Sequence, residues 1–188
     1  MGNREDLLAG ARQCLVDKGY ARTTVRDIAT ASGVSMAAIG YHFGSKEALL
    51  TAALSDATRE WGDELAQLLT NPPARTDPFQ HFAATWDTVR ASIGTHRGLW
   101  SATFDALSHP ETRARLAAEM PESRTGLAHL LAPTEPPTPA AARATGALYQ
   151  ALLVGIAAQY LIDPETAPTG TELAEALRRM VGLPQPAE

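Results

Sequence analysis

The segment TTVRDIATASGVSMAAIGYHFGSKEALL, residues 23–50, decides the fold of the N-terminal part of this 188-residue chain. Its pattern predicts two short helices, over residues 25–32 and 36–42, which are joined by a tight turn. Gly33 supplies the left-handed residue that ends the first of these helices. Two short helices that meet at such a turn are typical of a helix-turn-helix, whose second helix enters the major groove of DNA.

Local signals at the ends of both helices support this prediction. Thr24 is followed three residues later by Asp27, which resembles a capping box with Asp in place of Glu. Ser35 stands where it can cap the second helix. Ile28 and Ile39 are spaced to face inward, where they would hold the two helices at a fixed angle.

The second helix has the composition of a helix that lies close to DNA. Ala37, Ala38 and Gly40 are small, so the helix can approach the bases. Tyr41 and His42 can then donate to phosphates or touch base edges. Taken singly, each of these residues is also compatible with an ordinary exposed position; the ordered set favours DNA binding.

The rest of the chain predicts further helices and no strand. Apolar residues at helical spacing mark a helix over residues 4–18 and a long helix over residues 46–69, which connects the head to the body. Five more helices are expected over residues 79–94, 97–108, 110–131, 140–162 and 171–182. Pro121 is expected to kink or split the third of these five. Asn71-Pro72-Pro73 is expected to break the chain, and residues 133–139, which contain four prolines, are expected to form a loop.

The expected fold class is therefore all-α, with about nine helices. We expect a three-helix DNA-binding domain over residues 1–48 and a helical bundle for dimerisation and ligand binding over residues 49–188. The net charge is −5. Residues 1–50 hold six basic and five acidic residues, whereas the remainder holds ten and sixteen. Because this asymmetry is weak evidence for DNA, the motif has to carry the argument.

Composition also predicts the location of the protein. Cys14 is the one cysteine of the chain, so no disulfide can form within it, and its place on an apolar stripe predicts a core residue. The N-terminus is polar, and no run of 18 apolar residues occurs. We therefore expect a cytoplasmic protein with no membrane association.

The stretch from Leu7 to Leu54 resembles the DNA-binding domain of the TetR (tetracycline-repressor-like) family. The residues that carry the resemblance are Gly19-Tyr20, Thr23-Thr24, Ile28-Ala29, Gly33-Val34-Ser35, Tyr41-His42-Phe43 and Ser45-Lys46-Glu47-Ala48-Leu49. It implies operator contacts at Thr24, Arg26, Ser35, Met36, Ala37, Ala38, Tyr41, His42 and Lys46. The chain departs from the family at Ala37, where Gly is frequent, and at Gly40, where an aromatic residue is usual.

The resemblance implies a ligand-responsive repressor that binds an inverted-repeat operator as a homodimer. Small apolar residues at helical spacing offer the interface, although burial within one chain is the alternative: Ala144, Ala147, Leu148, Ala151, Leu152, Gly155, Leu173 and Leu177. Aromatic residues concentrate over residues 61–104. Most of them must be core, and we expect Trp86, Trp100 and Phe104 to line a pocket for a small-molecule effector.

Two other interpretations remain open. A constitutive DNA-binding regulator without an effector would have the same head. An all-α enzyme is disfavoured, because the chain has no nucleophile elbow, phosphate-binding loop or cluster of residues at metal-ligand spacing. We therefore expect no catalytic residue, no metal and no cofactor. The operator, the effector and the choice between repression and activation are left open by the sequence.

Overall fold

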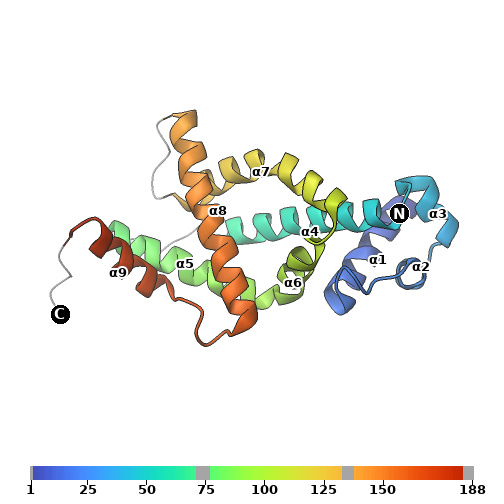
Figure 1. Ribbon diagram of the computed structural model, residues 1–188, viewed down its shortest axis with the longest axis horizontal. Coiled ribbons are helices and arrows are strands. Elements are labelled where there is room, and N and C mark those ends of the chain that lie inside the picture. The colour runs from blue at the N-terminus through green and yellow to red at the C-terminus, as the bar shows by residue number, and fades with distance from the viewer. Residues whose placement is uncertain (1, 71–76, 133–137, 184–188) are drawn as a thin grey trace. The chain divides into compact units, whose positions relative to one another are not determined.

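The structure, a computed structural model, describes residues 2–70, 77–132 and 138–183 (Figure 1). Within these ranges it contains nine α-helices and no strand. The helices are α1 (Asn3–Lys18), α2 (Val25–Ser32), α3 (Met36–Phe43), α4 (Lys46–Leu69), α5 (Pro78–Thr95), α6 (Arg97–Ala106), α7 (Pro110–Leu131), α8 (Pro139–Ile162) and α9 (Gly170–Met180). The all-α class is confirmed, and each predicted helix is present within two residues at either end. The predicted break at 71–73 and residues 133–137 of the predicted loop lie outside the described residues; Pro139, expected in that loop, is instead the first residue of α8.

The helices form two compact units, each built from two segments of the chain. The first unit contains the chain up to Asp63 together with residues 96–120, and the second contains residues 64–95 and the chain from Pro121 onward. Both α4 and α7 therefore contribute to both units. Helix α7 runs without interruption through Pro121, so this proline does not split it.

The first unit packs α1, α2 and α3 around a core of apolar side chains. The fully buried members are Leu7, Ala11, Ile28, Leu49, Leu50 and Leu54. Gly10 lets α1 approach α2, because a Cβ at this position would lie 2.8 Å from the Cβ of Ser32. Cys14 is buried as predicted, and burial raises the pKa of its thiol. The thiol is therefore a core group with little thiolate character at neutral pH.

Hydrogen bonds between polar groups join α6 and the first half of α7 to the rest of the first unit. The hydroxyl of Tyr20 lies 2.8 Å from that of Thr112, which is 2.9 Å from the hydroxyl of Thr51. The carboxylate of Asp105 accepts a 2.8 Å hydrogen bond from the backbone N–H of Ala21. These bonds hold the segment after α1 against helices that follow some ninety residues later in the chain.

The second unit places α5 against α8 and α9. Trp86, on α5, is 1% exposed, and its ring contacts those of Phe82 and Tyr149. Because burial desolvates the phenol of Tyr149, its pKa is raised, and the side chain stays neutral. Aromatic packing therefore fills the centre of this unit.

Two glycines set the spacing of the helices in the second unit. A Cβ at Gly146, on α8, would lie 1.8 Å from the carbonyl oxygen of Arg124 on α7. A Cβ at Gly170, the first residue of α9, would lie 1.9 Å from the carbonyl oxygen of Ala83 on α5. The carboxylate of Asp87 also accepts from the backbone N–H of Gly170 at 2.7 Å. Backbone therefore packs directly on backbone at both positions.

Candidate nucleic-acid interface

The turn between α2 and α3 has the geometry that the sequence predicts. The hydroxyl of Thr24 accepts from the N–H of Asp27 at 3.2 Å, while the Asp27 carboxylate accepts from the N–H of Thr24 at 2.9 Å. Gly33 ends α2 in the left-handed conformation, with φ of 68°. Ser35 occupies the N-cap position of α3, but its side chain makes no capping bond with any described residue. The capping box and the glycine turn are thus confirmed, and the side-chain cap by Ser35 is not formed.

Asp27 is held ionised on the surface of the head. The ammonium of Lys18 lies 2.5 Å from its carboxylate, and the Thr24 hydroxyl also donates to it at 2.7 Å. The Lys18 contact is the main reason that the pKa of Asp27 lies well below its usual range. The paired ammonium offsets a carboxylate charge that would otherwise repel phosphate.

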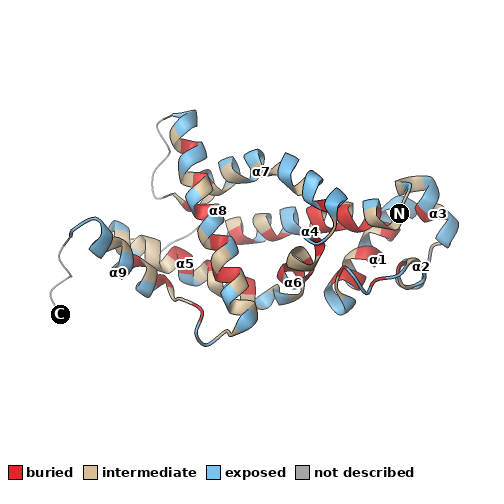
Figure 2. Cartoon of the chain, viewed as in Figure 1, coloured by how far each residue is buried: buried red, intermediate tan, exposed pale blue. Residues whose placement is uncertain are grey.

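Helix α3 turns one face to solvent and the other to the core. Ile39 is 3% exposed on the inner side, whereas Tyr41 is 86% and Met36 52% exposed. Ala37 and Gly40 are exposed as well, which leaves a mostly pale blue helix in Figure 2. The outward face of α3 therefore carries only short side chains or none, except at Tyr41 and Met36.

The residues expected to contact an operator belong to α2, α3 and the helix starts beside them. The exposed ones are Thr24, Arg26, Ser35, Met36, Ala37 and Tyr41; the half-buried ones are Ala38, His42 and Lys46. The rings of Tyr41 and His42 meet edge to face, with centroids 4.9 Å apart. This contact restricts both side chains on the outer part of α3.

Lys46 is already engaged within the head. Its ammonium donates to the carbonyl oxygen of Thr23 at 3.2 Å and lies 3.4 Å from the carboxylate of Glu47. These contacts fix the side chain between the start of α2 and the start of α4. A phosphate at this point would meet a positioned cation.

The sequence pattern did not single out Arg4, a further cation beside α3. Its guanidinium lies over the ring of Phe43, 5.3 Å from the centroid, and the residue is exposed. The contact joins the first turn of α1 to the last residue of α3. No spacing rule reveals it, since the two residues are far apart in sequence and meet only in the folded head.

The three aromatic residues expected at an effector pocket are distributed over both units. Trp86 belongs to the aromatic core of the second unit, while Trp100 and Phe104 lie on α6 in the first. Trp100 is 6% exposed and meets the ring of Trp61 edge to face at 5.1 Å. Its indole N–H has no hydrogen-bond partner among the residues that the structure describes. Such a buried donor is costly unless a water or ligand satisfies it.

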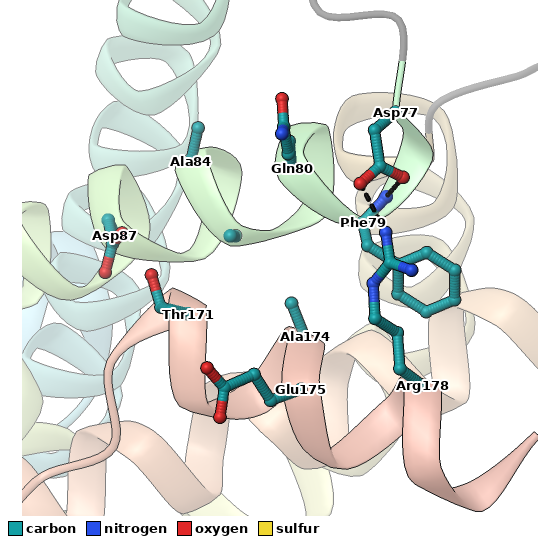
Figure 3. A pocket seen from close by; sticks show the side chains of 10 residues that line it. Asp77, Phe79, Gln80, Ala84, Asp87, Thr171, Ala174, Glu175 and Arg178 are labelled. Atoms are coloured by element: carbon teal, nitrogen blue, oxygen red, sulfur yellow. Dashed lines mark hydrogen bonds and ion pairs between the residues drawn. The ribbon is translucent and has the colours of Figure 1, made fainter. Parts of the chain in front are cut away.

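A surface groove of ≈ 420 Å³ lies between α5 and α9 in the second unit (Figure 3). Its charged groups are engaged: Arg178 pairs with Asp77 and stacks on Phe79, 4.3 Å from the ring centroid. Asp87 accepts from the start of α9, and Glu175 lies 3.4 Å from the guanidinium of Arg179. The charged side chains that line the groove therefore already have partners within the protein. In the described part of the chain, no group of three or more His, Cys, Asp or Glu side chains is placed to hold a metal.

Helix α8 carries apolar residues on two opposite faces. Its inner face is buried and consists of Ala142, Gly146, Tyr149, Leu153, Ile156 and Ala157. On the opposite side Leu148 is 53% and Ile162 84% exposed. By length and composition alone α8 would pass for a membrane-spanning helix, with 28% of its most apolar window buried. Figure 2 shows buried and exposed residues along α8, and Leu148 and Ile162 place apolar surface on the exposed face.

The residues expected at a dimer interface lie on or beside this exposed face of α8 and on α9. Ala144, Leu148 and Ala151 are exposed, and the half-buried members are Ala147, Leu152, Gly155, Leu173 and Leu177. Met180, near the end of α9, is 81% exposed. None of these eight residues is fully buried in the single chain, and five of them are partly covered by it.

Comparison with known proteins agrees with this geometry. Residues 7–53 match the family described as "Bacterial regulatory proteins, tetR family". The repressor AcnR of Corynebacterium efficiens is 45% identical over 60 residues, which is 31% of this chain and 32% of that protein. AcnR of Corynebacterium diphtheriae is 44% identical over 118 residues, 62% of this chain and 46% of its own. The chain thus matches less than half the length of these relatives.

A solved structure extends the likeness to the remaining helices. The multidrug binding protein EbrR superposes with a TM-score of 0.64 at 25% identity, over 98% of this chain and 92% of its own. A helix-turn-helix head followed by a helical body of this kind is the architecture of bacterial transcriptional regulators. Residues 7–53, the head of this chain, match the DNA-binding domain of the TetR family of these regulators.

Proposed function

We propose that this protein is a ligand-responsive repressor that binds an inverted-repeat operator as a homodimer in the cytoplasm. The observation that supports it most is the outward face of α3, with Tyr41 almost fully exposed, in a head that matches the family. The two AcnR relatives are named as repressors, and repression is proposed here by that likeness. The predicted domains, residues 1–48 for DNA and 49–188 for dimer and ligand, are part of this proposal.

DNA binding is tested with the duplex that the full-length protein selects from a random library. Fluorescence anisotropy then measures affinity for this duplex over a range of salt concentrations. Arg26→Ala is expected to weaken binding and to reduce the slope of log K against log salt by about one, because one phosphate contact is lost. Arg59→Ala is the matched control, since Arg59 is an equally exposed arginine on α4. If the wild-type protein enriches no sequence, the proposed function is wrong.

The second apolar face of α8 supports the dimer. A 24-residue helix with one buried and one exposed apolar face is unusual for a monomer. Its small residues would let two copies of α8 approach closely, and α9 would add Leu173 and Leu177 beside it. A two-fold dimer would present two heads to the two half-sites of an inverted repeat.

Sedimentation velocity tests this interface. Leu148→Glu places a charge in the proposed contact and should convert the dimer to monomers, with loss of operator binding. Arg143→Glu, which changes charge on another side of the same helix, should remain dimeric. A wild-type protein that sediments as a monomer at micromolar concentration would rule the interface out.

An effector site near Trp100 is supported by the unpaired indole N–H in an apolar setting. We propose that the effector is a largely apolar molecule with a hydrogen-bond acceptor for this N–H, and that Phe104 contacts it on the same helix. Trp86 is the corresponding candidate in the second unit. Ligand binding would alter operator affinity only through a difference in its affinity for the two protein states.

Proflavin is a suitable first probe, because EbrR, 25% identical to this chain, has been crystallised with it. We expect it to quench the tryptophan fluorescence of the DNA-free protein; because proflavin itself intercalates into DNA, operator affinity is measured with the other compounds named below. Trp100→Phe should weaken the binding of acceptor-bearing aromatic compounds by removing the N–H while keeping an aromatic ring. If a panel of acceptor-bearing aromatic compounds leaves operator affinity unchanged, the protein is a constitutive regulator.

A further inference from the structure

Gly40 lies inside α3, yet nothing among the residues that the structure describes requires a glycine there. Its φ is not positive, so the backbone conformation suits any L-residue. A Cβ at this position would meet nothing within 4 Å in the part of the chain that the structure describes. Glycine inside a helix destabilises it relative to alanine, because it loses the most backbone entropy on folding. The free protein therefore gains nothing from this residue.

The place of Gly40 on α3 indicates where its advantage arises. It is exposed, as are Ala37 one turn earlier and the neighbouring Tyr41, while Ile39 faces the core. Open space alone is not distinctive, because Gly62 on α4 and Gly126 on α7 also have no described atom within 4 Å of a Cβ. Gly40 differs from both in lying on the face that the proposed function turns toward DNA.

We infer that operator DNA lies against the backbone of α3 at Gly40, closely enough to exclude a side chain. This inference rests on the proposed DNA-binding function. A helix with its side chains is about 10–12 Å across and the major groove about 12 Å wide, so clearance is small. Removing the side chain at residue 40 lets α3 sit deeper in the groove. Sequence recognition then depends on the flanking side chains of Tyr41 and His42.

The experiment compares three full-length variants on the duplex selected by the wild-type protein. Gly40→Ala adds one methyl group, and Gly40→Tyr restores the aromatic residue usual in the family. Gly62→Ala is the control, since it makes the same chemical change at another open helical glycine of the same unit. Thermal unfolding and anisotropy are measured on each.

We expect both alanine variants to raise Tm, by about 1–3 °C. Gly40→Ala should nevertheless bind the duplex about tenfold more weakly or worse, Gly40→Tyr more weakly still, and Gly62→Ala like the wild type. If either Gly40 variant binds the duplex as tightly as the wild type or more tightly, the inference is wrong, while the proposed DNA-binding function stands. Failure of the wild-type protein to select any duplex overturns both, so the two failures are distinguishable.

Discussion

The first and second units join their helices by different means. In the first, hydroxyl groups of Tyr20, Thr51 and Thr112 meet in a buried cluster. In the second, Gly146 and Gly170 bring backbone against backbone, with less room for a Cβ than Gly10 has beside Ser32 in the first. Where hydrogen bonds join two helices, removing one hydroxyl group costs one hydrogen bond. Where backbone packs on backbone at a glycine, adding a Cβ forces the two helices apart. The second unit should therefore be the more sensitive of the two to single substitutions.

The largest effect is expected for Gly146→Ala. The added Cβ would overlap the carbonyl oxygen of Arg124, so α7 and α8 must separate, at a cost of about 3 kcal/mol of unfolding free energy. Denaturant unfolding measures this loss. Gly126→Ala on α7 is the control and should be neutral or slightly stabilising, because a Cβ there meets no described atom. A loss below 1 kcal/mol at Gly146 would show that the helices adjust easily.

A smaller effect is expected when one hydroxyl leaves the cluster of the first unit. Thr112→Val keeps the shape but removes a partner from Tyr20 and Thr51, whose hydroxyls are 3.3 Å apart and can still pair. We expect a loss of about 1–1.5 kcal/mol in chemical denaturation. Thr88→Val is the control, because that hydroxyl bonds only to the carbonyl of Ala84 on its own helix. An equal loss in both variants would remove the difference between the units.

The smallest effect concerns acid stability, and it compares the capping boxes of the two units. Bonds from Thr24 and Lys18 lower the pKa of Asp27, and bonds from Thr169 lower that of Glu172. Since both folded-state pKa values lie below the unfolded ones, each carboxylate stabilises the fold above pH ~4. That stabilisation is lost as pH falls through the folded-state pKa.

Asp27→Asn should therefore flatten the decline of Tm between about pH 5 and pH 3. Glu172→Gln should do so less, because Lys18 reinforces only the first box. Asp63→Asn, on an exposed part of α4, is the control and should follow the wild-type curve. If the Tm of Asp27→Asn declines with falling pH as steeply as that of the wild type, other carboxylates are responsible for the acid sensitivity.

Helix bounds could be predicted because their signals are local. The box at Thr24 and Asp27, the turn at Gly33 and the apolar spacing of α4 all lie within a few residues of the features they determine. The composition of the units could not be predicted in this way. Asp105 meets Ala21 across 84 positions, and Thr112 meets Tyr20 across 92. Contacts between residues so far apart produce no periodic pattern in a single sequence.

The outward positions of α3 could likewise be predicted from helical spacing, and Tyr41 and Met36 are indeed exposed. Spacing does not determine side-chain partners, which is why the bonds of Lys46 and the stacking of Arg4 on Phe43 were missed. It also treated Trp86 and Trp100 as one aromatic group, whereas they belong to different units. Aromatic composition indicates burial and does not indicate in which core a ring is buried.

The discontinuous first unit has a consequence for synthesis on the ribosome. Its last helical segment ends at Met120, so 120 of the 188 residues must be made before this unit has all its parts. Before residue 105 is made the nascent head lacks Asp105, and before residue 112 is made Tyr20 lacks its partner Thr112 from α7. Domains usually fold as units during translation. A chain stalled before residue 120 would thus carry a helix-turn-helix without its full support.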